Sequence, residues 1–425
     1  MSTTTVLWTA PAVLGLAVLT QATNDPLAIS TYLAVLTGLL TWRLIPAVAD
    51  RFVAAGLSGK DVNKAHQPII PESLGIIAAT LYLICLFLFI PFPFRQWFPA
   101  EPAVLSLRTF PFQRLGEFLA ALLCLQSMVF LGFADDVFDI RWRYKLVMPT
   151  VASIPLLMGY YLSDGITYVV LPIPLRPILG RILDIGILYY VYIAMLAIFC
   201  TNSINILAGI NGVEAGQSLV IALSVAANDL LYVNGPDRPA AEVHLFSLYF
   251  ILPFIAVTTA LLWHNWYPAR VFVGDTYCYF AGMTFAVVGI IGHFSKTLLL
   301  FFIPQIFNFI YSAPQLFRLV PCPRHRMPRL NPATGRLEPS DASLATATPT
   351  GLAVVRTLAR FRLVRVATDD AGTPLRVSNL TLLNMLLVHC GPLPENHLAA
   401  LVVALQVFGS VAAFTVRYQL VTFLY

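Results

Sequence analysis

The stretch "FLGFADDVFDIRWRYK", residues 130–145, decides what kind of fold this sequence can adopt. It overlaps the end of an apolar run at 114–134, and a membrane-spanning helix needs about 20 predominantly apolar residues. Three aspartates stand at the mouth of that run, and basic residues follow them. Ionisable groups at membrane depth are costly and are usually functional. The stretch therefore indicates a membrane helix that ends at a functional site.

The composition of the whole chain supports a membrane protein. Of its 425 residues, 58% are hydrophobic and 11% are charged, about half of the charged share typical of soluble proteins. With a mean hydropathy of +0.78, an intrinsically disordered chain is excluded and a soluble fold nearly so. The net charge of +5 comes without the dense basic runs of nucleic-acid binding, so we expect no nucleic-acid partner. Six cysteines without a CxxC pair favour neither a disulfide framework nor a zinc site.

Ten apolar runs are candidate membrane spans, separated by polar or proline-rich breaks. They cover residues 27–49, 74–93, 114–134, 144–163, 183–205, 214–233, 244–263, 275–292, 297–319 and 398–420. We therefore predict an all-α polytopic membrane protein of about ten transmembrane helices. Alternating apolar and basic residues at 350–378 predict a small mixed α/β insert on the cytosolic face before the last helix. The predicted segments are an apolar N-terminal extension (1–26), a transmembrane catalytic core (27–319), a loop (320–397) and the last helix with the C-terminus (398–425).

The order of the spans places the polar loops on one side of the membrane. If the loop at 50–73 is cytosolic, then so are the loops at 135–143, 206–213, 264–274 and 320–397. The last of these is rich in arginine, and long basic loops are cytosolic more often than not. We therefore expect the polar motifs to converge on the cytosolic face, and the Asn379 sequon in "NLT" to stay without a glycan.

The aspartates of the opening stretch form the first motif. On a continuing helix Asp135 and Asp139 share a face, with Asp136 adjacent. Three carboxylates at one helix mouth repel each other unless a cation or a proton is present. The alternative is a solvated helix end paired with the basic residues that follow, which are Arg141, Arg143 and Lys145.

Two other functional classes compete for these acids. DDxxD is also the pattern of Mg²⁺–diphosphate prenyltransferases, but those enzymes need a second Asp-rich motif, and "DDAGT" at Asp369 lacks the third acid. A transporter or channel predicts charged groups near mid-span and internal repeats. Here the charges cluster at the ends of spans and no repeat is visible, so neither class is favoured.

Amides, glycines and another aspartate follow the later spans. The stretch "CTNSINILAGINGVEAGQS", residues 200–218, is dense in asparagine and glycine, and amides ligate hard cations or read base edges. Its alternative is a turn that packs helices. In "WHNWYPARVFVGDT", residues 263–276, Asp275 could cap a helix and also ligate a metal, and Phe272 could stack on a base or simply pack.

A basic motif completes the set. "PCPRHRMPRLNPATGRLE", residues 321–338, places Arg324, His325 and Arg326 between prolines. Arginine forks match phosphate oxygens, although such a cluster also anchors the end of a span. Carboxylates, amides and arginines on one face are the parts of a Mg²⁺-assisted phosphoryl transfer. At a membrane surface, one substrate can be a lipid phosphate and the other a water-soluble nucleotide.

These motifs, with "LGFADDVFDIRWRYKLVMPT" at 131–150 and the continuation of the third one to Thr297, closely resemble a known enzyme family. It is the eukaryotic UDP-N-acetylglucosamine–dolichyl-phosphate N-acetylglucosaminephosphotransferases, which are of the glycosyltransferase family 4 type within the polyprenyl-phosphate N-acetylhexosamine-1-phosphate transferase superfamily. The resemblance runs from about Ile45 to the C-terminal "RYQL". It leaves out the first residues and parts of 340–378.

The resemblance implies an activity and a setting. The enzyme would transfer GlcNAc-1-phosphate from UDP-GlcNAc to dolichyl phosphate and release UMP, which is the first step of N-glycan precursor synthesis. It would be a ten-helix protein of the endoplasmic reticulum membrane, surrounded by membrane lipid, with its active site facing the cytosol. The family uses Mg²⁺, often forms homodimers and is the target of tunicamycin.

The resemblance also assigns roles to residues. The catalytic residues would be Asp135, Asp136 and Lys145. The metal would be held by Asn205 and Asp275. The UDP-GlcNAc donor would be bound by Lys60, Asp61, Val62, Glu72, Gly209, Asn211, Glu214, Phe272, Arg324, His325 and Arg326. The dolichyl phosphate acceptor would be bound by Lys145, Cys200, Thr201, Asn202 and Asn205. The sequence departs from the family at Asp139, where close relatives often carry Asn, and at Lys60 and the "AHQP" of the first loop.

Overall fold

The computed structural model describes residues 15, 25–97, 110–163, 165–323, 326–369 and 374–423. Within these ranges, eight helical stretches are long and apolar enough to cross a membrane. They are α2 (Pro26–Ala54), α4 (Phe112–Phe138), the consecutive α5 (Trp142–Ala152) and α6 (Ile154–Ser163), α8 (Ile187–Ile206), α9 (Val213–Val233), α10 (Arg238–Asn265), α11 (Gly274–Ile291) and α16 (Glu395–Thr415). The chain is thus an all-α polytopic membrane protein, as its sequence predicts.

The two remaining predicted spans depart from a simple crossing helix. The helix α3 (Gly75–Phe89) has 15 residues, a length of roughly 22 Å against a hydrocarbon core of about 30 Å. Pro91 and Pro93 follow it and cannot continue a helix. The predicted span at 297–319 is a pair, α12 (Ser295–Phe301) and α13 (Ile303–Leu316), which are bent by 71°. The break lies beside Pro304, which has no N–H to donate to a carbonyl of the preceding turn.

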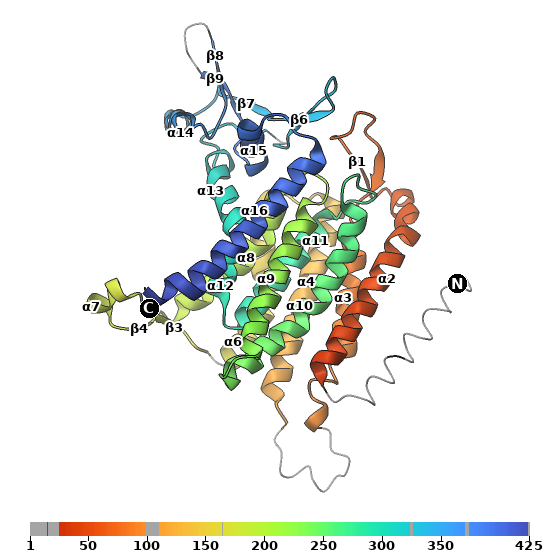
Figure 1. Cartoon of the computed structure of the whole chain (residues 1–425), viewed down its shortest axis with the longest axis vertical. Helices are drawn as coiled ribbons and strands as arrows, with labels where there is room; N and C mark the ends of the chain where they lie inside the picture. Colours follow the sequence, from red (N-terminus) through yellow and green to blue (C-terminus); the bar gives the residue numbers. More distant parts are fainter. Residues whose placement is uncertain are drawn as a thin grey trace.

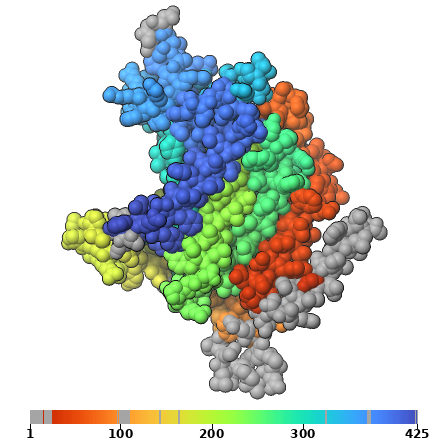
Figure 2. Space-filling model, viewed as in Figure 1, coloured from red at the N-terminus to blue at the C-terminus, as the bar shows by residue number. Residues whose placement is uncertain are grey.

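The helix α11 is the centre of the bundle. Every residue from Thr276 to Ile291 is buried, as expected of a helix that is apolar all round. It packs against α4, α8 and α10. At Gly282 a Cβ atom would lie 2.3 Å from the Cα atom of Thr201 on α8, so glycine is what allows these two backbones to approach. Figure 2 shows α2, α10 and α9 side by side on one face, with α16 crossing beside α9.

Short strands occupy the loops. Two antiparallel hairpins lie outside the insert, β1 (Ser58–Lys60) with β2 (Ile69–Pro71) and β3 (Tyr168–Val170) with β4 (Ile182–Asp184). The helix α7 (Arg176–Leu179) lies between β3 and β4. The insert before the last span contains β5 (Arg329–Asn331) paired with β6 (Arg336–Glu338), and a sheet in the order β7 (Asp341–Ser343), β9 (Pro374–Ser378), β8 (Val366–Thr368). Its helices are α14 (Pro349–Arg360) and α15 (Leu382–Cys390). The expected α/β insert is therefore present.

One end of the bundle gathers the polar loops. Figure 1 shows the β1–β2 hairpin, the start of α16 and the insert at the same end of the molecule. Hydrogen bonds join the loops there: Asn63 Nδ2 donates to the carbonyl of Gly209, and the N–H of Asp275 donates to Asp136 Oδ1. The prediction that the motifs converge at one end is confirmed.

Candidate active site

Two cavities open at the end of the bundle where the polar loops meet. We call the first, of about 510 Å³, the polar cavity, because acidic, amide and glycine residues make much of its wall. We call the second, of about 840 Å³, the groove; apolar residues of α8 and α13, among them Ile198, Phe199 and Phe309, make much of its wall. Both cavities are lined by Asp139, Asn205 and Met327. A ligand in one cavity therefore meets a ligand in the other at these three residues.

The β1–β2 hairpin is one wall of the polar cavity and is fastened to the loop before α11. The N–H of Phe272 donates to the carbonyl of Pro71 at 2.8 Å, and the N–H of Leu74 donates to the carbonyl of Phe272 at 3.1 Å. A Cβ atom at Gly59 would lie 3.2 Å from the ring of Phe272 and 3.1 Å from a carboxylate oxygen of Glu72. The Phe272 ring is therefore held as a flat apolar surface beside the polar wall.

Asp136 accepts hydrogen bonds from the first residues of α11. Its Oδ1 accepts a hydrogen bond from the N–H of Asp275 at 2.6 Å, and its Oδ2 accepts from both the N–H and the hydroxyl of Thr276. The first N–H groups of a helix have no partner within the helix, and here a carboxylate of α4 supplies one. The turn needs Gly274, which has φ of +75° and where a Cβ atom would lie 2.6 Å from Asp136 Oδ2.

This arrangement changes the reading of Asp275. The sequence suggested that Asp275 could cap its own helix, but the N-cap position is Val273, and the first N–H groups of α11 donate to Asp136. The Asp275 carboxylate is therefore not used as an N-cap. It is 28% exposed and faces the polar cavity.

A cluster of charge surrounds Asp275. Lys145 Nζ lies 2.9 Å from Asp275 Oδ2 and 2.8 Å from Asp135 Oδ2. Asp135 is buried, and it also accepts hydrogen bonds from the hydroxyl of Tyr279 and the N–H of Ile140. Asn205 Nδ2 donates to Asp275 Oδ1 at 2.9 Å. Lys145 therefore ties the end of α4 to the start of α11, at the junction of the two cavities.

Asn205 and Asp275 suit a hard divalent cation. Their amide and carboxylate oxygens are the donors that Mg²⁺ prefers, and the two side chains are already in contact. Among the described residues, no group of three or more His, Cys, Asp and Glu is placed to hold a metal. Mg²⁺ usually binds through one or two protein groups together with substrate phosphates and water. The donor set therefore fits a cation shared between the protein and a phosphate ligand.

Two loop residues have pKa values that are shifted mainly by burial. Burial raises the pKa of Glu72, and the negative charges of Asp136 and Asp275 raise it further. Burial lowers the pKa of Arg326, and its Nη1 is a buried donor that has no hydrogen-bond partner among the described residues. The polar cavity thus has excess negative charge that a cation would offset, while Arg326 in the groove wall has a donor available for an anion.

Most of the predicted site residues line one of the two cavities. In the polar cavity lie the two predicted catalytic aspartates, both predicted metal ligands and eight predicted donor residues, which are Lys60, Asp61, Val62, Glu72, Gly209, Asn211, Glu214 and Phe272. The groove holds Lys145, Asn202, Asn205 and Arg326. Arg326 was predicted as a donor residue, and the structure places it in the groove wall. Arg324 and His325, and nearly all of the predicted extension at 1–26, lie outside the described residues.

Two predicted acceptor residues do not reach the groove, and this is a correction. Cys200 and Thr201 are fully buried, and neither lines either cavity. They lie on the face of α8 that packs against Gly282 of α11, whereas Asn202 and Asn205 are turned toward the groove. Cys200 lies about 200° around the helix axis from Asn202, and Thr201, although one turn before Asn205, is covered by the close contact with α11.

Other wall residues were not predicted. Met327 lines both cavities, and Asn63 and Asn265 line the polar one. Asn265 Nδ2 donates to the carbonyl of Val271, which fixes the loop before α11. Asn265 belongs to the motif "WHNWYPARVFVGDT", and its amide is the feature of the sequence that could have indicated a site residue. Met327 gave no such signal, because a methionine after the arginine cluster is indistinguishable from a packing residue.

Comparison with known proteins places the chain among enzymes. Residues 118–293 match the family described as Glycosyl transferase family 4. The chain is 47% identical to the UDP-N-acetylglucosamine–dolichyl-phosphate N-acetylglucosaminephosphotransferase of Schizosaccharomyces pombe, over 97% of this chain and 96% of the relative. The protein of the same name from Saccharomyces cerevisiae is 47% identical, over 87% and 86%. A protein named as a putative enzyme of this kind from Saccharolobus solfataricus is 31% identical, over 69% and 78%.

Proposed function

Since the chain belongs to the family of UDP-N-acetylglucosamine–dolichyl-phosphate N-acetylglucosaminephosphotransferases, we propose that its two cavities hold the two substrates of that reaction. It transfers GlcNAc-1-phosphate from UDP-GlcNAc to dolichyl phosphate. The products are GlcNAc-diphosphodolichol and UMP. This is the first step in making the lipid-linked precursor of N-glycans.

The meeting of a polar cavity and an apolar groove is the observation that carries the proposal. A sugar nucleotide is polar and charged, and a dolichyl chain is hydrocarbon, so the two substrates need walls of opposite character. The cavities share Asp139, Asn205 and Met327, which brings the two phosphate-bearing ends together. Holding two reactants in contact supplies much of the rate of a transfer that needs little covalent chemistry from the protein.

The polar cavity holds the donor. Phe272 presents a flat ring for the uracil, and Asn211 presents an amide that can hydrogen-bond to it. Asn205 and Asp275 would hold Mg²⁺, whose charge would offset that of the diphosphate. Lys60, Asp61, Val62 and Glu72 belong to the same wall. Arg324 and His325 belong to this proposal through the family pattern alone.

The groove holds the acceptor. Its apolar wall on α8 and α13 takes the isoprenoid chain, and Lys145, Asn202 and Arg326 are among the polar residues of its wall. Nη1 of Arg326, which has no hydrogen-bond partner in the part of the chain that the structure describes, is a donor for phosphate oxygen. Lys145 bridges Asp135 and Asp275 in the structure. Its ammonium can therefore bind the acceptor phosphate while it stays beside the donor diphosphate.

The transfer needs positioning more than a base. An oxygen of the dolichyl phosphate forms a bond to the β-phosphorus of UDP-GlcNAc, and the bond from that phosphorus to the bridging oxygen breaks, so that UMP leaves with the bond's electrons. A phosphate monoester has a second pKa near 6, so much of the acceptor is already a dianion at neutral pH. Asp136, whose two oxygens accept hydrogen bonds from α11, fixes Asp275 instead of taking a proton.

The setting follows from the family and from the charge of the loops. The active-site end faces the cytosol, since the insert on that end is rich in arginine. The membrane is that of the endoplasmic reticulum, and the working form is a homodimer. We expect tunicamycin, of which the family is the target, to inhibit this enzyme.

The proposal is tested by the reaction itself. Purified full-length protein is incubated with radiolabelled UDP-GlcNAc, dolichyl phosphate and Mg²⁺, and label is measured in the lipid extract. We expect lipid-linked GlcNAc that requires both dolichyl phosphate and Mg²⁺ and that tunicamycin prevents. Asn205→Ala should abolish the product, while Asn234→Ala, at the far end of α9, should retain it. If the wild type forms no labelled lipid with both substrates and Mg²⁺ present, the proposal fails.

A further inference from the structure

Lys64 lies behind the wall of the polar cavity, where its ammonium group meets several partners. Its side chain is 12% exposed. Nζ donates to Asn211 Oδ1 at 3.0 Å, forms an ion pair with Asp61 at 3.2 Å and another with Glu395, and lies 4.4 Å from the centre of the Tyr267 ring. Asp61 and Asn211 line the cavity, whereas Lys64 is not among the residues of its wall.

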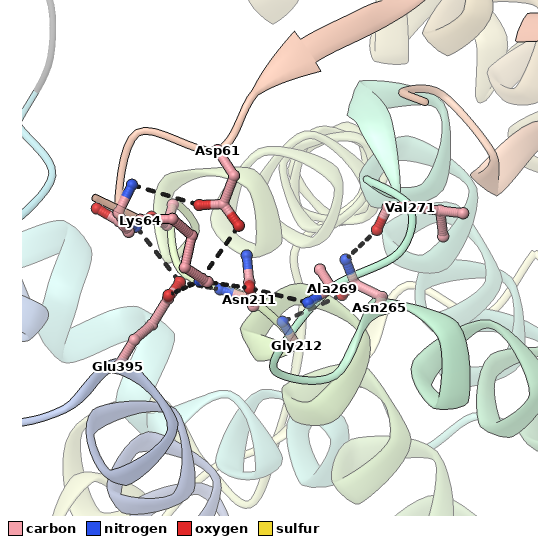
Figure 3. Close-up of polar contacts among 10 residues, drawn as sticks. Asp61, Lys64, Asn211, Gly212, Asn265, Ala269, Val271 and Glu395 are labelled. Atoms are coloured by element: carbon pink, nitrogen blue, oxygen red, sulfur yellow. Dashed lines mark hydrogen bonds and ion pairs between the residues drawn. The ribbon is translucent and has the colours of Figure 1, made fainter. Parts of the chain in front are cut away.

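Two partners of Asn211 fix the orientation of its side-chain amide. Lys64 Nζ and the N–H of Ala269 can only donate, and both meet Asn211 Oδ1, at 3.0 and 3.1 Å. The carbonyl half of the amide must therefore face away from the cavity interior. The Nδ2 half is the part left to donate a hydrogen bond to a ligand. Figure 3 shows Lys64 and Ala269 approaching Asn211 from the loops that carry them.

Glu395 contacts both Lys64 and the backbone of Asn211. It is the first residue of α16 and only 4% exposed. Its Oε1 accepts a hydrogen bond from the N–H of Asn211 at 2.8 Å and another from Asn63 Nδ2 at 3.4 Å, while Oε2 pairs with Lys64. Figure 3 shows Glu395 reaching from α16 to the loop of Lys64 and the turn of Asn211. One buried carboxylate thus joins three segments that are far apart in sequence.

We propose that Lys64 and Glu395 are positioning residues for the donor, which fix the Asn211 amide so that its Nδ2 meets a carbonyl oxygen of the pyrimidine base. The inference rests on the proposed function for the identity of the donor. Glu395 sets the backbone of Asn211 and Lys64 sets its side chain, so both halves of the residue are fixed. The last transmembrane helix thereby contributes to nucleotide binding without touching the nucleotide.

Changing either residue should weaken the binding of the nucleotide. In Lys64→Met, Asn211 Oδ1 loses a charged donor and the amide can turn over. In Glu395→Gln, the NH₂ group of the new side chain must face either the ammonium of Lys64 or the N–H of Asn211. Both are donors, so either orientation places a donor against a donor. Loss of a hydrogen bond to a charged group corresponds to a roughly ten- to hundredfold change in a binding constant.

The experiment compares donor and acceptor constants in the full-length protein. For the wild type, Lys64→Met, Lys64→Arg and Glu395→Gln we would measure the KM for UDP-GlcNAc, the KM for dolichyl phosphate, kcat, the affinity for UMP and the melting temperature. We expect Lys64→Met and Glu395→Gln to raise the KM for UDP-GlcNAc and to weaken UMP binding by roughly ten- to hundredfold. The KM for dolichyl phosphate should change by less than about twofold, and Lys64→Arg, which keeps a charged donor, should recover most of the UMP affinity.

A matched control separates positioning from stability. Ser410 is also a buried polar residue of α16, and it accepts a hydrogen bond from Ser224 of α9 at 2.8 Å. It lies roughly 22 Å along the helix from Glu395. Ser410→Ala should lower the melting temperature and leave the UMP affinity unchanged.

Three results would overturn the inference. They are UMP affinity unchanged in a folded Lys64→Met or Glu395→Gln protein, equal increases in the donor and acceptor KM values, and weaker UMP binding in Ser410→Ala of the same size as in Glu395→Gln. Should Lys64→Met fail to fold, Glu395→Asp keeps the charge but shortens the side chain, so it should weaken UMP binding, and an unchanged UMP affinity in folded Glu395→Asp would overturn the inference as well. UMP binding is measured without turnover, so it tests the inference even where the transfer assay of the wild type shows no product.

Discussion

At the scale of single residues, the three aspartates of the opening stretch have separate tasks. Asp135 is buried between Lys145 and Tyr279, and Asp136 receives the start of α11. Asp139 ends α4 with φ of +46°, and its N–H donates to the carbonyl of Asp135. Asp and Asn tolerate this left-handed conformation better than most residues, so either residue can occupy this position.

The role of Asp136 gives a prediction. Asp136→Asn replaces one accepting oxygen by an NH₂ group that faces N–H donors of α11, so Asp275 loses its fixed position. We expect turnover to fall by at least about a hundredfold, and to stay low when the pH is raised from 7 to 9. The measurement is the transfer assay across that pH range.

Two comparisons make the result for Asp136 decisive. Thr276→Ser keeps the hydroxyl that donates to Asp136 and should retain activity. Recovery of Asp136→Asn at high pH would identify Asp136 as a base and contradict the positioning role.

Residue types in the motifs could be predicted, but their partners could not. Asp275, Asn205 and Asn211 stood out because carboxylates and amides are costly near a membrane. Cys200 and Thr201 were wrongly predicted to reach the acceptor, because the close contact of α8 with Gly282 of α11, which buries them, cannot be seen in the sequence. Glu395 was missed because its partners Lys64 and Asn211 lie more than 180 residues earlier, and a single acid at the start of an apolar helix is typical of helices in general.

At the scale of elements, α11 determines where the site lies. It is buried over nearly its whole length, and its first turn carries Asp275. Its position against α8 depends on Gly282, where no other residue fits between the backbones. The spans themselves were predictable from apolar length, whereas the 71° bend between α12 and α13 was not, because the apolar pattern continues through it.

The contact at Gly282 can be tested by substitution. Gly282→Val should destabilise the protein by at least about 1–3 kcal/mol, since overpacking a tight core costs that much even without backbone clashes. Thermal unfolding of the purified protein measures this.

Gly116→Ala on α4 is the matched control for Gly282. A Cβ atom there meets nothing within 4 Å, so the melting temperature should hold or rise, as alanine favours a helix. Equal melting temperatures for Gly282→Val and the wild type would show that α8 and α11 do not approach as described.

At the scale of the whole molecule, the polar loops of many spans meet at one end. Parity of the spans predicted this, and the insert added its arginines to the same end. Asn379 is buried there, where its amide donates to Ser340 and accepts from Gln315. Burial alone keeps the folded sequon without a glycan, so the absence of a glycan says nothing about which side the site faces.

Exposed cysteines provide a direct test of sidedness. Cys322 and Cys390 are exposed near the active-site end, while the other four cysteines are buried. In sealed microsomes with the cytosolic face outward, a membrane-impermeant maleimide should label the protein without detergent. The double variant Cys322→Ser/Cys390→Ser should remain unlabelled, and labelling of the wild type that appears only after permeabilisation would place the site in the lumen.

In the proposed reaction a sugar phosphate, and not a sugar alone, passes from the donor to the acceptor. The most direct measurement uses UDP-GlcNAc labelled with ³²P in the β-phosphate and with ³H in the sugar, incubated with the protein, dolichyl phosphate and Mg²⁺. The account predicts that both labels enter the lipid in equal amounts and that the released UMP carries no ³²P. Tritium in the lipid without ³²P, with labelled UDP released, would contradict it.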